Sequence, residues 1–102
     1  MNKEKAKEIF KTAWKEFESS NFENAITLCD NLIEYDPNIC QVYYLKGLCY
    51  AKSEEFESAL ETFEKSTQKD TKNELNGYNY YEIAKLYIGK FYSCTICLWW
   101  LH

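Results

Sequence analysis

The chain has 102 residues, of which 46% are hydrophobic and 18% aromatic, enough for one packed domain and too few for two. Its single proline and three glycines disfavour a loop-rich or all-β fold and favour long helices. The formal net charge of −4 argues against general binding to nucleic acids.

The sequence gives no sign of secretion or of a membrane span. Residues 1–5 (MNKEK) lack the apolar segment of a signal peptide. The longest apolar run, residues 91–101, is about half the length that a membrane helix needs. The five cysteines have no disulfide-framework spacing, so most are interpreted as free thiols in a cytoplasmic or nuclear protein.

The first predicted element is an amphipathic helix over residues 3–18, because its apolar side chains recur at the spacing of one helical face. Lys7, Lys11 and Lys15 lie four residues apart on this helix and therefore form a basic stripe. We interpret the stripe as a solvated face with no binding role.

A second helix is predicted over residues 22–35. Ser20 and Glu23 have the spacing of a capping box, in which two side chains satisfy the first backbone N–H groups of a helix. Pro37 ends the segment, because proline cannot continue a helix and disfavours helical backbone in the residue before it. Asn38 is a residue type that caps the start of a following helix.

Two further helices are predicted over residues 39–52 and 56–69, with Phe56 facing inward and a polar connector after the second. Gly47 lies inside the first of them, where glycine costs about 0.5–1 kcal/mol relative to alanine. We therefore predict that a closely packed neighbouring helix requires it. A fifth helix is predicted over residues 78–88, then a turn at Gly89 and a sixth helix from about residue 91 to 101.

An aromatic residue followed three positions later by a small residue recurs along the chain at a period near 34 residues. We expect the aromatic ring to fill the corner between two helices and the small residue to permit close helix packing. Such self-similarity is typical of helical repeats. The copies start at Phe22, Phe56 and, in a degenerate form, Phe91.

The middle copy resembles the tetratricopeptide repeat, whose signature is aromatic-x₂-Leu-Gly-x₂-Tyr followed by Ala-x₃-Phe and a proline. Lys46 and Thr71 depart from it, where leucine and proline are expected. The third repeat is degenerate. The matching residues of the middle repeat are Tyr43, Gly47, Tyr50, Ala59 and Phe63.

The resemblance implies an all-α superhelix, or solenoid, of three antiparallel helix-turn-helix hairpins. It predicts one domain over residues 1–102, with repeats at approximately 6–39, 40–73 and 77–102. It also implies a non-enzymatic scaffold for protein–protein interaction, in which the first helix of each hairpin lines a concave groove that binds a peptide or a partner helix.

The predicted groove is aromatic and nearly uncharged, which suits an amphipathic helix of a partner. The alternative is that several of these rings pack between hairpins and meet no partner. The residues predicted to line it are Phe10, Trp14, Phe17, Tyr44, Leu48, Ala51, Tyr78, Tyr81 and Lys85.

The predicted last helix is apolar nearly all the way round, although terminal repeats normally have a polar outer face. A second hypothesis is therefore a structural subunit that assembles through this helix into a homo- or hetero-oligomer. The alternative is a simple buried terminal helix. The residues of the predicted assembly surface are Ile96, Leu98, Trp99, Trp100 and Leu101.

A third, less favoured function is that of a co-chaperone clamp for acidic C-terminal tails. Within the family such clamps use lysine, arginine and asparagine side chains on the groove-lining helices. Only one of the corresponding side chains in this sequence, Lys85, is able to bind a carboxylate. The other corresponding positions hold Phe10, Trp14, Leu45 and Tyr81.

No catalytic residue, metal site or cofactor is predicted. The only histidine is the final residue, His102. Cys94 and Cys97 have redox-motif spacing, but no βαβ pattern accompanies them, and a structural zinc site needs about four ligands. They are interpreted as small core residues, as are Cys29, Cys40 and Cys49.

Overall fold

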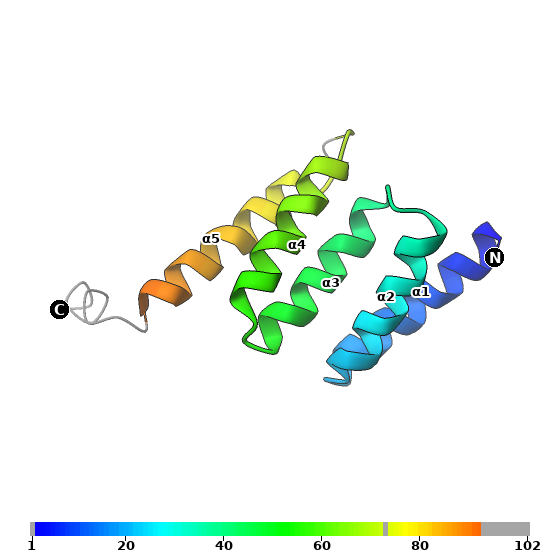
Figure 1. Ribbon diagram of the computed structural model, residues 1–102, viewed down its shortest axis with the longest axis horizontal. Helices are drawn as coiled ribbons and strands as arrows, with labels where there is room; N and C mark the ends of the chain where they lie inside the picture. The colour runs from blue at the N-terminus through cyan, green and yellow to red at the C-terminus, as the bar shows by residue number, and fades with distance from the viewer. Residues whose placement is uncertain (1, 73, 93–102) are drawn as a thin grey trace.

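The computed structural model describes residues 2–72 and 74–92, and this part of the chain is all helix and connecting turn (Figure 1). The helices follow one another across the molecule in chain order, each packed on its neighbours in sequence, and α1 also contacts α3. None of these helices is long and apolar enough to cross a membrane. They are α1 (Lys3–Glu18), α2 (Phe22–Tyr35), α3 (Cys40–Lys52), α4 (Phe56–Lys69) and α5 (Asn76–Tyr92).

The α1–α2 and α3–α4 turns share one backbone geometry. Ser20 adopts a left-handed conformation with φ 65°, and the next N–H, of Asn21, donates to the Glu16 carbonyl at 2.8 Å. This is the Schellman motif that ends a helix and satisfies its last carbonyl groups. In the second turn the corresponding groups are Glu54 with φ 63°, and the Glu55 N–H donating to the Tyr50 carbonyl at 2.9 Å.

The predicted helix caps are wrong at both positions. Ser20 belongs to the end of α1, so it cannot form a capping box, and Asn21 precedes α2 without a side-chain cap. Ile39 precedes α3, which starts one residue later than predicted. The Asn38 side chain instead accepts a hydrogen bond from Lys69 Nζ at 3.3 Å. Tertiary contacts and the preceding turn, rather than local capping, set these helix starts.

Two hydrophobic clusters form the core, one around α1, α2 and the inner face of α3, the other between α3, α4 and α5. The close packing predicted at Gly47 is confirmed, because a Cβ there would lie 2.7 Å from Phe63 Cε1. The small residues of the repeated motif, Ala25 and Ala59, are fully buried. Cys29 and Cys49 are also fully buried, in agreement with their interpretation as small core residues.

The two corner aromatics behave differently. Phe22 packs on Phe17 of α1, with ring centroids 5.8 Å apart. The prediction that Phe56 faces inward is wrong, since this side chain is 37% exposed. The residue that corresponds to Phe17 in the second repeat is Ala51, which is too short to offer Phe56 a ring to pack against.

Buried polar groups hold α5 against the end of α4. The Asp70 carboxylate accepts hydrogen bonds from the backbone N–H groups of Glu74 at 2.8 Å and Leu75 at 2.6 Å. Asn79 Nδ2 donates to Ser66 Oγ at 2.9 Å, and that hydroxyl donates to the backbone carbonyl at the start of α3 at 2.9 Å. The connection between the second and third repeats thus combines these hydrogen bonds with the apolar packing of the second cluster.

The prediction of a turn at Gly89 is wrong, because α5 continues through it to Tyr92. An interior glycine costs only about 1 kcal/mol relative to alanine, and no proline or polar segment follows to stop the helix. The start of the predicted sixth helix therefore belongs to α5. Its remaining residues, which include the predicted assembly surface, lie outside the described residues.

Candidate partner-binding groove

The first helices of the repeats, α1, α3 and α5, enclose a common hollow with a volume of about 390 Å³. We call it the inner groove. Its apolar residues come from all three helices, and its charged residues lie on α3 and α5. The lining residues are Phe17, Tyr44, Leu48, Ala51, Lys52, Glu82, Lys85 and Leu86.

Five of the nine residues predicted to line a groove meet at this hollow: Phe17, Tyr44, Leu48, Ala51 and Lys85. The other four do not line it. Phe10 borders a separate cleft at the opposite end of α1, and Trp14, Tyr78 and Tyr81 lie outside both.

The aromatic side chains of α1 pack on each other as well as on the core. Trp14 lies edge-on between Phe10 and Phe17, with ring centroids 6.3 and 5.6 Å away. All three are partly buried against the first hydrophobic cluster. Edge-to-face pairs of this kind add stability beyond their buried area. The ring contacts of Trp14 are thus made within α1.

Tyr44 connects three helices at the centre of the groove. Its ring lies 5.9 Å from Phe63 of α4 and 6.3 Å from Tyr78 of α5, measured between centroids. Burial, followed by the nearby negative charge of Glu82, raises the pKa of the Tyr44 hydroxyl above its ordinary value. The hydroxyl is therefore neutral at physiological pH and available as a hydrogen-bond donor.

The inner groove is more charged than the sequence predicted, because Lys52 and Glu82 join Lys85. Lys85 Nζ lies 3.2 Å from Glu82 Oε1 and 4.9 Å from the centroid of the Tyr81 ring. The Lys85 side chain is 51% exposed and that of Glu82 only 12%, so the lysine is the member of the pair that is able to turn toward a ligand. Helical spacing could have revealed both residues, since Lys52 lies four after Leu48 and Glu82 four before Leu86.

Lys46 stands where the tetratricopeptide signature has leucine. Its Nζ lies 2.6 Å from Asp30 Oδ1 of α2, and 5.8 Å from the centroid of the Tyr50 ring. Burial lowers the pKa of Lys46, but the hydrogen bond and charge of Asp30 outweigh it, so that the pKa is raised overall. The departure thus replaces an apolar contact between the first two repeats with an ion pair.

The buried thiols are not suited to nucleophilic chemistry. Burial, reinforced by Cys49 and Asp30, raises the pKa of Cys29 to about 12, and burial raises the pKa of Cys49 to about 11. The thiolate is the nucleophilic form, and it is not populated near neutral pH at such values. The three cysteines in the part of the chain that the structure describes are free thiols with a packing role.

Two helical hairpins with the same turn geometry lie 34 residues apart, and α5 follows them as the first helix of a third repeat. This arrangement defines a tetratricopeptide-type repeat protein. The model of the family described as anaphase-promoting complex, cyclosome, subunit 3 matches residues 18–96, which is more than half of the chain, and the chain belongs to this family. No curated protein matches the chain. Repeats of this type are protein–protein interaction modules and are in general non-enzymatic.

Proposed function

We propose that this chain is a non-enzymatic interaction module that holds an amphipathic helix or peptide of a partner protein in the inner groove. The observation that carries the proposal is the convergence of three helices on one hollow that is lined by both apolar and charged side chains. Phe17, Leu48 and Leu86 supply apolar surface, and Lys52, Glu82 and Lys85 supply charge.

This composition matches what a partner helix needs. An amphipathic helix buries its apolar side chains in a groove and keeps its polar side chains at the rim. Tyr44 adds a large, rigid ring with a hydroxyl that is able to donate a hydrogen bond, and such residues are enriched among those that dominate binding energy. The exposed side chains of Tyr78 and Tyr81, next to the hollow on α5, extend the apolar surface.

The proposal is tested with a displayed library of helical peptides, selected on the whole chain and then measured by fluorescence anisotropy. Leu48→Ser, in the groove, is expected to weaken the selected peptides by at least about tenfold, in the range of a truncated interface anchor. The matched control is Leu60→Ser on α4. Leu60 packs on the same hydrophobic cluster as Leu48 but does not line the groove.

Both variants lose similar apolar packing, so circular dichroism and urea unfolding should show similar losses of stability. Only Leu48→Ser should lose peptide binding. Equal binding losses in the two variants would mean that folding, and not the groove, controls binding, and the proposal would be rejected.

A second candidate function is that of a structural subunit in a larger assembly. The family description names a subunit of a complex, and this supports the assembly role. The apolar side chains predicted for the contact include Trp99 and Trp100. Sedimentation of the wild-type chain is expected to show self-association that Trp99→Ser/Trp100→Ser abolishes. A wild-type chain that remains a monomer at high concentration would contradict the homo-oligomeric form of this proposal.

A further inference from the structure

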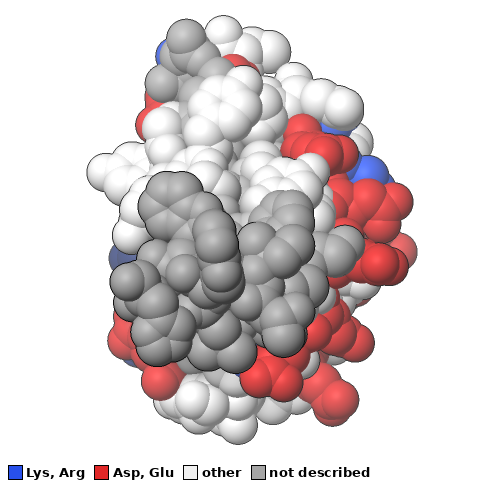
Figure 2. All heavy atoms as spheres, turned by 90° about the vertical axis from the view of Figure 1, so that its left-hand side faces the viewer, with Lys and Arg blue, Asp and Glu red and all other residues white. Residues whose placement is uncertain are grey.

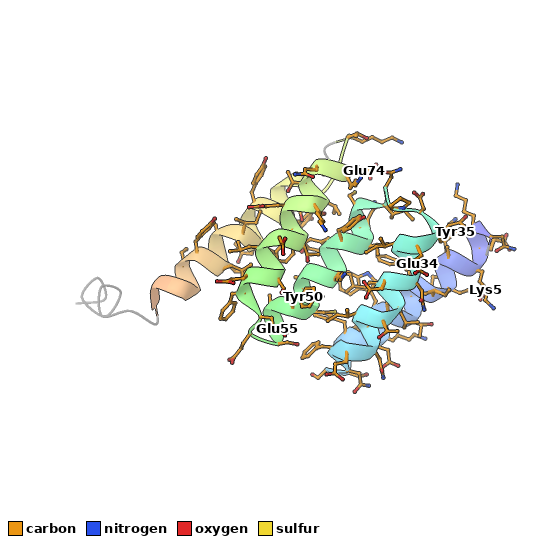
Figure 3. All side chains as sticks on the ribbon, viewed as in Figure 1. Lys5, Glu34, Tyr35, Tyr50, Glu55 and Glu74 are labelled. Atoms are coloured by element: carbon orange, nitrogen blue, oxygen red, sulfur yellow. The ribbon has the colours of Figure 1, made fainter. Side chains whose placement is uncertain are left out.

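A second cleft, with a volume of about 620 Å³, lies between the first half of α1 and the start of α3, over the end of α2. We call it the lysine cleft. Its floor is apolar, and three lysines of α1 border it. Figure 3 labels Tyr35, which lines the cleft at the end of α2. The apolar floor and the lysine border consist of Ala6, Phe10, Leu32, Ile39 and Val42, and of Lys3, Lys7 and Lys11.

The three lysines form a regular row along the cleft. Lys3, Lys7 and Lys11 are spaced by four residues, which separates their Cα atoms by about 6 Å along the helix axis. All three are exposed. The ion pairs in the described part of the chain are Lys46–Asp30 and Lys85–Glu82, so neither involves this row.

The row stands out against the rest of the surface. The chain carries a net charge of −4, and the sequence of α2 contains three acidic residues and no lysine. Figure 2 shows acidic side chains gathered along one side of the molecule, with few basic ones on the face in view. An acidic partner is therefore attracted at the lysine cleft, on a chain whose net charge is negative.

Asp36 is the one acidic residue among those that line the cleft, and its charge determines how an acidic segment is oriented in the cleft. It lies at the α2 end, where its Oδ1 accepts the Asn38 N–H at 3.0 Å. A bound segment that carries carboxylates avoids this end and turns its acidic side toward the lysines of α1. The floor of the cleft is recessed, so it accommodates protruding side chains of a partner. A lipid surface is flat and has no such side chains, which favours a protein partner over a membrane.

We propose that the lysine cleft docks a helical segment of a partner protein whose apolar ridge fills the floor and whose Asp or Glu side chains, four residues apart, pair with Lys3, Lys7 and Lys11. Matching periods allow each carboxylate to meet a lysine when two helices lie alongside each other. The site is separate from the inner groove, so the inference does not depend on the groove proposal.

The probe is a displayed library of helical peptides of about 15 residues, a length at which isolated helices begin to form. Its apolar positions are fixed and its polar positions are random. Selection on the whole chain is expected to enrich Asp and Glu at four-residue spacing. Lys7→Glu/Lys11→Glu should then weaken the selected peptides by at least about tenfold, since like charges replace opposite ones.

The matched control is Lys5→Glu/Lys15→Glu, which makes the same charge change on the same helix at exposed positions outside the cleft. Figure 3 shows Lys5 at the outer end of α1. The control is expected to change affinity by less than about threefold, as for a change in long-range charge alone. Raised salt should weaken binding to the wild-type chain and leave the residual binding of the cleft variant little changed.

Four outcomes would overturn the inference. The selected peptides lack acidic enrichment, the control variant weakens them as much as the cleft variant does, or Leu48→Ser abolishes their binding while Lys7→Glu/Lys11→Glu does not. The last result would assign acidic peptides to the inner groove and leave the groove proposal standing. Binding of the chain to anionic lipid vesicles, lost in the cleft variant while no peptide is selected, would assign the row to a membrane and also overturn the inference.

Discussion

The two connections between repeats differ in the chemistry that holds them. Where the first repeat meets α3, the buried part of the contact is apolar: Leu32, Leu45 and Cys49 are buried together, and the ion pair of Lys46 with Asp30 lies outside this cluster. Where α4 meets α5, buried hydrogen bonds of Asp70 and Asn79 add to the apolar contact of Phe63 and Leu86. The same repeat geometry is thus maintained by two kinds of interaction.

The polar connection demands more of its geometry. Apolar contacts are non-directional and tolerate small shifts, whereas a buried polar group that loses its partner is strongly penalised. Asn79 is fully buried, and its Oδ1 has no hydrogen-bond partner within the described residues. We therefore expect α5 to separate from the molecule more easily than α3 does.

The largest expected effect is at the apolar connection. Leu45→Ala should lower the free energy of unfolding by about 2–5 kcal/mol, because it leaves a cavity in a well-packed core. Urea unfolding measures the change. Tyr80→Ala, at a side chain that is 58% exposed, is the control and should stay within about 0.5 kcal/mol of wild type. If Leu45→Ala lowered the free energy of unfolding as little as the control does, the apolar connection would not have the predicted strength.

An intermediate effect is expected at the polar connection. Asp70→Ala removes the acceptor of two backbone N–H groups and should weaken the protection of α5 amides from hydrogen exchange by about 1–3 kcal/mol. Amides of α1 and α2 should keep their protection. The control is Asp36→Ala, 34 residues earlier, whose carboxylate accepts a single local N–H. Uniform loss of protection across all helices would show that α5 does not open separately.

The smallest effect concerns the turns, which the two hairpins share. Ser20→Gly and Glu54→Gly should each stabilise the chain by roughly 0.5–1 kcal/mol, because glycine adopts the left-handed conformation without steric cost. Ser53→Gly, one position before Glu54 at φ −86, is the control and should not stabilise. Thermal unfolding distinguishes these variants. If the two substitutions stabilised the chain by different amounts, the two hairpins would differ in stability as well as the two connections.

Helix positions were largely predictable because they follow from local pattern. The apolar period and Pro37 placed α1, α2 and α4 at their observed bounds, and Gly47 correctly indicated a close helix contact. Capping was not predictable in the same way. Ser20 has the right identity for an N-cap, but the end of the preceding helix already fixes its backbone in the left-handed region.

The candidate sites were predictable only in part. The resemblance to tetratricopeptide repeats predicted that Phe17, Tyr44 and Leu48 share one surface, and these three side chains line the inner groove. The lysine cleft was not foreseen, and Lys7 and Lys11 were interpreted as a solvated face. Periodicity tells which side chains share a face, but not that α3 and the end of α2 form a hollow beside it.

The nearest-neighbour packing of the helices has a consequence for how the chain folds. Contacts between elements adjacent in sequence require little loop closure, so folding is expected to be fast and able to start in either hairpin. The Schellman bonds link groups only five residues apart, so each turn forms without waiting for the rest of the chain. During synthesis from the N-terminus, α1 and α2 are able to pair before α4 is made. The hydrogen bonds of Asp70 to the backbone before α5 are expected to form last.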